Sequence, residues 1–294
     1  MVKSLPESLR AVYPWTGTFL DVNGGKMHVI DEGPKDAPVL LAIHGNPTWS
    51  FYWRALIAKF AGPYRVVAVD HIGCGLSDKP QDWPYRLADH VGNVVKVIEA
   101  LGLRDITLVV HDWGGAIGSG VATLHPEWIK RLVITNTGAW RSLRIPPSIA
   151  TVKIPIFGTL AVRGLNGFAQ VATVRATAKG LSAVAKQGLL FPYDSWANRI
   201  ATLRFVQDIP LHAAHPSYAE LGRIDDGLVK LLDKPMLILW GDDDFCFTPA
   251  FRAEWERRFP AAEVHAWKDV GHYVMEDAPE RALSLIAAFL ERTA

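Results

Sequence analysis

The segment LVVHDWGGAIG (residues 108–118) places an aspartate, Asp112, between an apolar run and a glycine-rich stretch. A strand that turns sharply into a helix can present such a side chain on an elbow, where it can attack a substrate. Aspartate, with an ordinary pKa of about 3.9, is ionised at neutral pH without help from a base. Asp112 is therefore a candidate nucleophile for displacement at a saturated carbon. Taken alone, the position also suits a helix cap.

Two later segments supply the partners that such a nucleophile needs. ILWGDDDFCFTP (238–249) puts a carboxylate after a later apolar run, and KDVGHYVMEDAPE (268–280) puts His272 in a loop before the last predicted helix. Attack by Asp112 leaves an ester, and His272 can deprotonate the water that hydrolyses it. Asp244 is expected to orient the imidazole and to stabilise its cationic form. Its neighbours Asp242 and Asp243 stay open as alternatives.

An earlier segment, AIHGNPTWSFYWR (42–54), also follows an apolar run and contains a His-Gly turn next to a proline. Such a turn can aim a main-chain N–H at an oxyanion, here that of Asn46, with the N–H of Trp113 as the second donor. The nearby His44 and His111 lie beside these catalytic positions, and we interpret both as structural.

The elements that must position these residues alternate between two patterns. Near-continuous apolar runs suit the strands of a parallel sheet that is covered on both faces, and helical patterns lie between them. The predicted strands cover residues 39–44, 64–70, 106–112, 131–137, 235–240 and 262–267, and the predicted helices cover 88–103, 114–126 and 249–259. This alternation predicts an α/β fold with a mostly parallel, doubly wound sheet.

The alternation stops between residues 139 and 230, where helical stretches are punctuated by prolines and contain no convincing strand. We interpret this segment as an inserted helical cap, and residues 1–138 and 231–294 as the core. From Trp128 to Tyr193 the chain has nine Lys and Arg residues and no Asp or Glu. A solvated basic face is the simpler interpretation, and weak association with an anionic membrane surface or a partner enzyme is the functional one. We expect some of the apolar cap residues to line a wide slot, with Ile154, Ile156, Phe157 and Leu160 as candidates.

Composition limits the partners. The 294-residue chain has 31 basic and 30 acidic residues, so its charge balance does not indicate nucleic acid, and a small-molecule substrate is expected. No Cys/His group has the spacing of metal ligands and no phosphate-binding motif occurs, so neither a metal nor a cofactor is implied. Two cysteines and the lack of a signal peptide or membrane span favour the cytoplasm. The oligomeric state is left open.

The motifs HGNPTWSFYWR, DHIGCGLSDKP (70–80), VVHDWGG and VGHYVMED together resemble the haloalkane dehalogenase family of α/β-hydrolases. The cap sequence FPYDSWANRIATLRFVQDIPL (191–211) is similar to that of the third subfamily, which includes the β-lactone decarboxylases of bacterial olefin biosynthesis. The resemblance implies an α/β-hydrolase fold with Asp112 as nucleophile and His272 as base. It also implies that the indole of Trp113 and the side-chain amide of Asn46 bind the departing halide.

The family places its catalytic acid after either of two strands. Neutral Asn136 stands at the first position here, and Asp244 stands at the second in the pattern W-G-x-x-D, so Asp244 is the implied acid. The resemblance is less specific for substrate than for fold. Dehalogenation of a haloalkane is the main expectation, and β-lactone decarboxylation with the same aspartate is the alternative. An epoxide hydrolase, with Tyr193 or Tyr218 as the proton donor, and a non-enzymatic ligand receptor are further alternatives.

Overall fold

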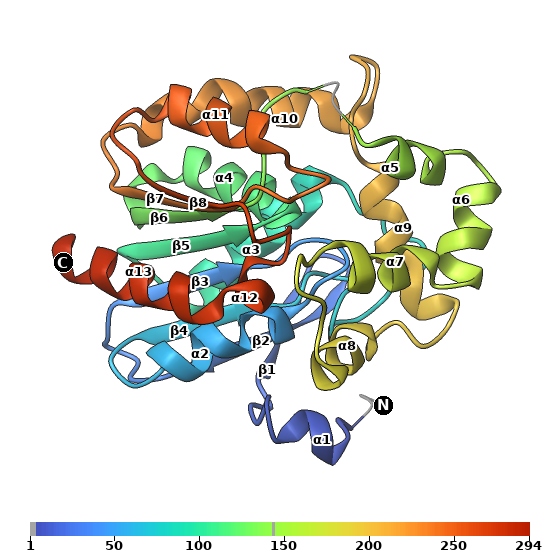
Figure 1. Cartoon of the computed structure of the whole chain (residues 1–294), viewed down its shortest axis with the longest axis horizontal. Coiled ribbons are helices and arrows are strands. Elements are labelled where there is room, and N and C mark those ends of the chain that lie inside the picture. Colours follow the sequence, from blue (N-terminus) through green and yellow to red (C-terminus); the bar gives the residue numbers. More distant parts are fainter. Residues whose placement is uncertain (1–3, 143–144) are drawn as a thin grey trace.

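A computed structural model describes residues 4–142 and 145–294 and contains one sheet with helices on both faces (Figure 1). Eight strands follow the order β1-β2-β4-β3-β5-β6-β7-β8. They are β1 (Thr18–Val22), β2 (Gly25–Glu32), β3 (Val39–Ile43), β4 (Arg65–Val69), β5 (Ile106–His111), β6 (Ile129–Thr135), β7 (Met236–Gly241) and β8 (Glu263–Trp267). From β4 to β8 all neighbours pair in parallel, and the order runs in both directions from β3. The predicted doubly wound sheet is thus confirmed.

The central strands are buried on both faces, which explains why their sequences read as continuous apolar runs. Successive side chains of β3 point to opposite sides of the sheet, as the pleat requires. Leu41 and Ile43 join the hydrophobic core on one side, and Leu40 and Ala42 join the core on the other. The sheet therefore lies between two apolar layers, and its strand ends are fixed from both sides.

The first two strands were not predicted. β1 pairs antiparallel with β2, and β2 pairs antiparallel with β4. Most residues of β1 are exposed or half-buried, so the hairpin lacks the apolar run that identified the other strands. The turn between them contains Asn23 and Gly24, a pair that often makes tight hairpins.

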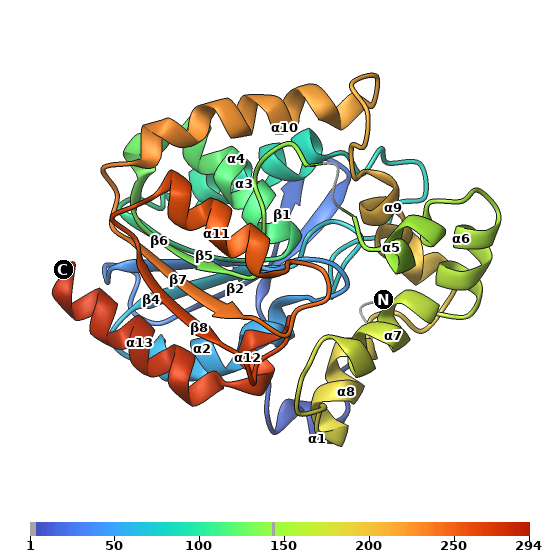
Figure 2. The same cartoon turned by 45° about the horizontal axis from the view of Figure 1, so that its top comes forward.

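Within the described residues, seven helices of the core divide between the two faces of the sheet (Figures 1 and 2). One face carries α3 (Leu87–Leu101), α4 (Trp113–Leu124), α10 (Pro216–Gly227) and α11 (Pro249–Arg258), and the other carries α2 (Arg54–Phe60), α12 (Val274–Asp277) and α13 (Pro279–Arg292). Short helices precede or join these elements, namely α1 (Glu7–Arg10), η1 (Ser50–Trp53), η2 (Pro126–Trp128) and η5 (Leu228–Leu231).

The described part of residues 139–230 is helical and contributes no strand to the sheet. Its elements are α5 (Pro147–Val152), α6 (Phe157–Thr159), the π-helical turn η3 (Leu160–Gly164), α7 (Gly167–Arg175), α8 (Ala183–Leu190), η4 (Ala197–Arg199) and α9 (Ile200–Gln207), followed by α10. Helices α5 to α9 gather beside one end of the sheet, whereas α10 packs against α3 and α4 (Figure 1). Over the described ranges, every helix is too short or too polar to cross a membrane.

A buried carboxylate, Asp70, ties together three segments next to the site. It follows β4, and its Oδ2 lies 2.8 Å from Nδ1 of His28 on β2. Its two oxygens also accept the main-chain N–H groups of Ser50, at 2.6 Å, and Leu76, at 2.9 Å. Because a buried carboxylate is costly without such partners, the two loops and β2 are held in one arrangement.

The Asp70 network predicts a large loss of stability on truncation. Asp70→Ala leaves His28 and two main-chain N–H groups without their acceptor, and breaking a buried pair in this way costs about 3–5 kcal/mol. Urea denaturation monitored by circular dichroism measures this free energy of unfolding. The control Asp21→Ala removes only an exposed ion pair with Lys26, which is worth at most about 1 kcal/mol. Equal losses in the two variants would contradict the structural role of Asp70.

Candidate active site

Asp112 sits at a sharp turn between β5 and α4, with a positive φ of 53° and a ψ of −129° that side chains rarely adopt. Its N–H donates to the carbonyl of Asn136 at 3.1 Å, and its own carbonyl accepts the N–H of Gly115 at 2.9 Å. The turn also requires a close approach to β3, since a Cβ at Gly114 would lie 2.1 Å from the carbonyl oxygen of Ile43. The elbow predicted from the sequence around Asp112 is therefore present as a backbone conformation.

The Asp112 carboxylate is held by main-chain donors on both sides. The N–H of Asn46, in the loop after β3, donates to Oδ1 at 2.6 Å, and the N–H of Trp113 is a second donor. Gly45 permits this approach, because a Cβ there would lie 2.1 Å from the same oxygen. Burial raises the pKa of Asp112, and the charge of His272 and the two N–H groups offset only part of this effect. The two donors predicted for an oxyanion thus both bind the carboxylate of Asp112 itself.

His272 lies between two carboxylates. Its Nδ1 is 2.7 Å from Oδ2 of Asp244, and its Nε2 is 3.6 Å from Oδ2 of Asp112. Burial lowers the pKa of His272, but attraction to Asp244 and Asp112 outweighs it, so that the pKa is raised overall. The three residues predicted as a triad are thus brought together, with the imidazole oriented by Asp244 and facing Asp112.

Asp244 is itself fixed by two neighbours to which the sequence had given no role. The side-chain amide of Asn136 donates to Oδ2 of Asp244 at 2.8 Å, and the N–H of Cys246 donates to Oδ1 at 2.6 Å. Asn136 also exchanges two hydrogen bonds with the main chain of Gly241. The sequence signal for this role was that Asn136 stands at the family's alternative position for the catalytic acid. In contrast, Asp242 pairs with Arg252, so its carboxylate is directed elsewhere.

The side chains of Asn46 and Trp113, predicted as halide donors, have different surroundings. The Asn46 amide donates to the main-chain carbonyl of Thr202 on α9 at 3.1 Å. The indole of Trp113 packs against Phe205 and lines the pocket, and its N–H has no acceptor within the described residues. The Trp113 indole is thus available to a ligand, whereas the Asn46 amide already has a protein acceptor.

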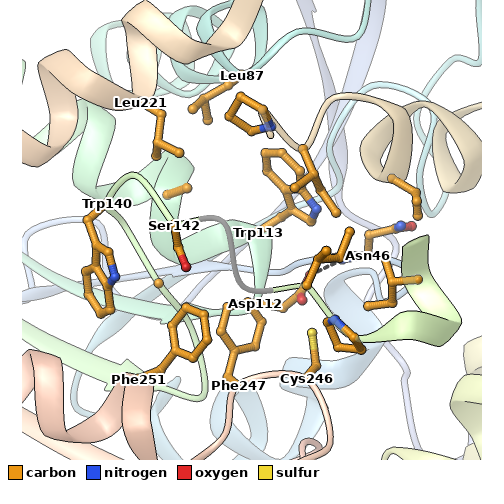
Figure 3. Close-up of a pocket in the computed structure, with 18 of the residues that line it drawn as sticks. Asn46, Leu87, Asp112, Trp113, Trp140, Ser142, Leu221, Cys246, Phe247 and Phe251 are labelled. Carbon is orange, nitrogen blue, oxygen red and sulfur yellow. Dashed lines mark hydrogen bonds between the residues drawn. The ribbon is translucent and has the colours of Figure 1, made fainter. Parts of the chain in front are cut away.

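A pocket opens above Asp112 (Figure 3) and contains about 880 Å³ of empty space, its open mouth included. Its floor is formed by Asp112, Asn46 and Trp113. Its walls are mostly apolar and come from the core and the cap, with Leu87, Trp140, Ile149, Phe168, Val206, Leu221, Phe247 and Phe251 among them. Such a pocket suits a hydrocarbon ligand that reacts at one end or in its middle.

The apolar cap residues expected in this wall are not there. Each is more than half exposed and absent from the pocket lining, which applies to Ile154, Ile156, Phe157 and Leu160. The prediction was wrong because it used apolar character alone, and the neighbouring helices α5 and α7 supply Ile149 and Phe168 to the pocket instead.

The histidines near the site are deeply buried. His44 has Nδ1 at 2.6 Å from the Gly45 carbonyl, and its Nε2 accepts the N–H of His71 at 3.0 Å. His111 contacts the carbonyl of His272 through Nε2 at 3.0 Å. Burial lowers the pKa of His44 and His111, so both are held neutral. Across the described ranges, no three His, Cys, Asp or Glu side chains gather as a metal site would require.

The Asp244–His272 contact predicts how the imidazole titrates. In NMR titrations of the side-chain nitrogens, His272 should keep its proton above the ordinary pKa of about 6.5, because Asp244 stabilises the imidazolium. Asp244→Asn removes that charge and should lower the pKa. The control Asp242→Asn, whose carboxylate pairs with Arg252, should leave it unchanged. If the pKa of His272 fell in Asp242→Asn and not in Asp244→Asn, Asp244 would not be the carboxylate that stabilises the imidazolium.

Comparisons with known proteins show the family to which the chain belongs. A family model described as "alpha/beta hydrolase fold" matches residues 38–279. Two proteins named cis-3-alkyl-4-alkyloxetan-2-one decarboxylase are each 41% identical to this chain. The one from Shewanella oneidensis aligns over 97% of this chain and 91% of its own. The one from Xanthomonas campestris pv. campestris aligns over 95% and 97%.

Haloalkane dehalogenases are more distant relatives. The enzyme of that name from Mycobacterium marinum is 32% identical over 94% of both chains. The crystal structure of the haloalkane dehalogenase DatA from Agrobacterium tumefaciens C58 superposes with a TM-score of 0.83 and 27% identity, covering 95% of this chain and 98% of that one. The chain is therefore an enzyme of the haloalkane dehalogenase family, within the α/β-hydrolase fold, and its most similar relatives above are β-lactone decarboxylases.

Proposed function

We propose that this enzyme decarboxylates cis-3-alkyl-4-alkyloxetan-2-ones, which are β-lactones, to alkenes and carbon dioxide. The observation that carries the proposal is the 41% identity, over nearly the full length, to two decarboxylases named for this substrate. Haloalkane dehalogenation, the main expectation from the sequence, becomes the second candidate. The pocket supports ranking the lactone above the haloalkane, since its apolar walls suit two alkyl chains and its floor offers a carboxylate.

In the proposed first step, Asp112 attacks the ring carbon that bears oxygen, opposite the carbonyl carbon. The carbon–oxygen bond of the ring breaks, and relief of ring strain favours the opening. The products are an alkyl ester on Asp112 and a carboxylate that stays attached to the adjacent carbon. Nucleophilic attack at a saturated carbon inverts it, and a neutral-pH carboxylate needs no base for this step.

In the proposed second step, the substrate carboxylate leaves as carbon dioxide. Its bonding electrons form the double bond, and the bond to the Asp112 oxygen breaks to regenerate the carboxylate. No water is consumed, and atoms and charge balance. Inversion followed by anti elimination converts a cis lactone into a cis alkene, so the stereochemistry of the product reports on the path.

His272 then acts without deprotonating water. Its raised pKa favours the imidazolium, with Nε2 3.6 Å from Asp112. A cation at this place stabilises the carboxylate that is released in each step. Asp244 orients the ring through the 2.7 Å contact with Nδ1, and Asn136 and the Cys246 N–H orient Asp244 in turn.

One observation favours dehalogenation as the second candidate. The indole N–H of Trp113 has no acceptor in the described chain and lies at the pocket floor, where a departing halide would need a donor. The engaged Asn46 amide provides less support, because halide binding would require it to release Thr202. For an epoxide hydrolase, neither Tyr193 nor Tyr218 is among the residues that line the pocket.

The first test offers purified enzyme a long-chain cis-3,4-dialkyl β-lactone and, separately, a bromoalkane. We expect a cis alkene by gas chromatography and an equal amount of carbon dioxide from the lactone, at a higher kcat/KM than bromide release. Asp112→Ala should lose both activities and keep the circular dichroism of the fold. Faster bromide release, or a β-hydroxy acid instead of an alkene, would contradict the proposal.

The second test follows oxygen from solvent. After many turnovers of lactone in ¹⁸O-water, mass spectrometry of the peptide that contains Asp112 should find no ¹⁸O, because the ester is broken at its alkyl carbon. Hydrolysis of an ester formed from a bromoalkane would insert ¹⁸O into Asp112, since water attacks the carbonyl. Asp244 in its own peptide is the internal control. Label in Asp112 during lactone turnover would rule out the eliminative second step.

A further inference from the structure

The cap has an exposed apolar surface on the side away from the pocket. Its members are more than half exposed and come from the segment between α5 and the end of α7, namely Ile154, Ile156, Phe157, Leu160, Leu165, Val171 and Val174. Both views show α6 at the outer edge of the molecule, on the side of the cap, with α5 and α7 nearby (Figures 1 and 2). We call these seven residues the cap patch.

The patch follows helical periodicity. Phe157 and Leu160 are three residues apart on the continuous turns of α6 and η3, and Leu165 follows after one further turn. Val171 and Val174 are likewise three apart on α7, which packs against η3. A helix with its apolar stripe toward solvent reverses the normal pattern of a globular protein. Exposed apolar surface of this kind marks an interaction site.

Ile156 stands in a conformation that its side chain disfavours. Its φ of 67° and ψ of −59° form a γ-turn, closed by the N–H of Phe157 to the carbonyl of Pro155 at 2.7 Å. Positive φ is unusual for a β-branched residue, and this side chain is 76% exposed. Backbone strain and apolar exposure therefore coincide at one position, where glycine would avoid both.

The charge around the patch is positive. Residues 129–193 contain no Asp or Glu. Lys153 donates to the carbonyls of Val206, Gln207 and Ile209, and Arg163 donates to oxygens of Trp196 and Gln81. These partners are neutral, so they orient the cations without cancelling their charge.

The basic residues between Trp128 and Tyr193 do not all lie on one face of the cap, however. Arg131 is buried against the carbonyl of Leu290, Arg141 pairs with Asp225 and Asp226, and Lys179 pairs with Asp269. Arg144 lies outside the described residues. Exposed Lys186 and Arg175 add to the charge near α7 and α8. The apolar residues must therefore contribute most of any interaction, with electrostatics as a secondary contribution.

We propose that the cap patch docks on an anionic lipid bilayer. Apolar side chains in a helical stripe next to Lys and Arg suit burial at the headgroup and acyl boundary, with the cations at the phosphates. The docked helices would also separate bilayer from pocket, because Ile149 of α5 and Phe168 of α7 line its wall. Delivery of long-chain β-lactones by this route rests on the proposed function. Docking itself does not.

The test is flotation of the full-length enzyme with phosphatidylcholine vesicles and with vesicles that contain one quarter phosphatidylglycerol. We expect binding to the anionic vesicles, weaker at high salt, and at least a tenfold loss in Leu160→Glu and Val174→Glu. Val229→Glu is the matched control, since Val229 is also an exposed valine, at 64%, but lies on η5 outside the patch. Absence of binding at low salt, or an equal loss in Val229→Glu, would overturn the proposal.

Ile156→Gly separates docking from a structural role. Glycine tolerates the γ-turn, so this variant should melt at a higher temperature and still bind vesicles several-fold more weakly. Neither readout requires turnover, and they remain interpretable if the β-lactone proposal fails. Sedimentation velocity without lipid tests whether a second copy of the chain binds the cap patch instead. A dimer that Leu160→Glu dissociates would show that a second copy covers the patch, and would overturn docking on lipid.

Discussion

The site depends on the cost of keeping an ionised carboxylate away from water. Asp112 is nearly buried, and its charge persists only if donors and a cation reach it. Those groups come from separate strand ends: Asn46 after β3, Asp244 after β7 and His272 after β8. A parallel sheet collects all these ends along one edge, which is where open α/β sheets bind ligands. The doubly wound fold thus brings together the donors and the cation that the buried charge of Asp112 requires.

The same requirement explains the second layer of contacts. His272 in its charged form needs Asp244, and Asp244 in turn needs donors for both oxygens, which Asn136 and the N–H of Cys246 provide. Asn136 is itself fully buried, and Cys246 lines the pocket next to the site. Neutral Asn136 can donate from its amide where a second carboxylate could only repel. Asn136, at the family's alternative acid position, therefore fixes Asp244, the acid that is present.

The sequence predicted the interior of the fold better than its edge. Strands β3 to β7 are continuous or nearly continuous apolar runs, whereas β1 is largely exposed and left only the Asn23-Gly24 turn as a signal. The order of Asp112, Asp244 and His272 along the chain was also predictable, because local motifs surround each. Contacts such as Asn46 to Thr202 join residues far apart in sequence, and no local pattern carries them. In the cap, periodicity indicates which residues share a face. It does not indicate whether that face meets the pocket or solvent.

The bond between the Asn46 amide and the Thr202 carbonyl joins the cap to the loop that supports Asp112. Lifting α9 from the core would break it, and a buried amide left without an acceptor costs about 1–3 kcal/mol. The same movement would release the loop whose N–H holds the nucleophile. Helix α9 is therefore the part of the cap whose position is coupled to the nucleophile, so a change in the cap that leaves α9 in place also leaves the main-chain donor of Asp112 in place.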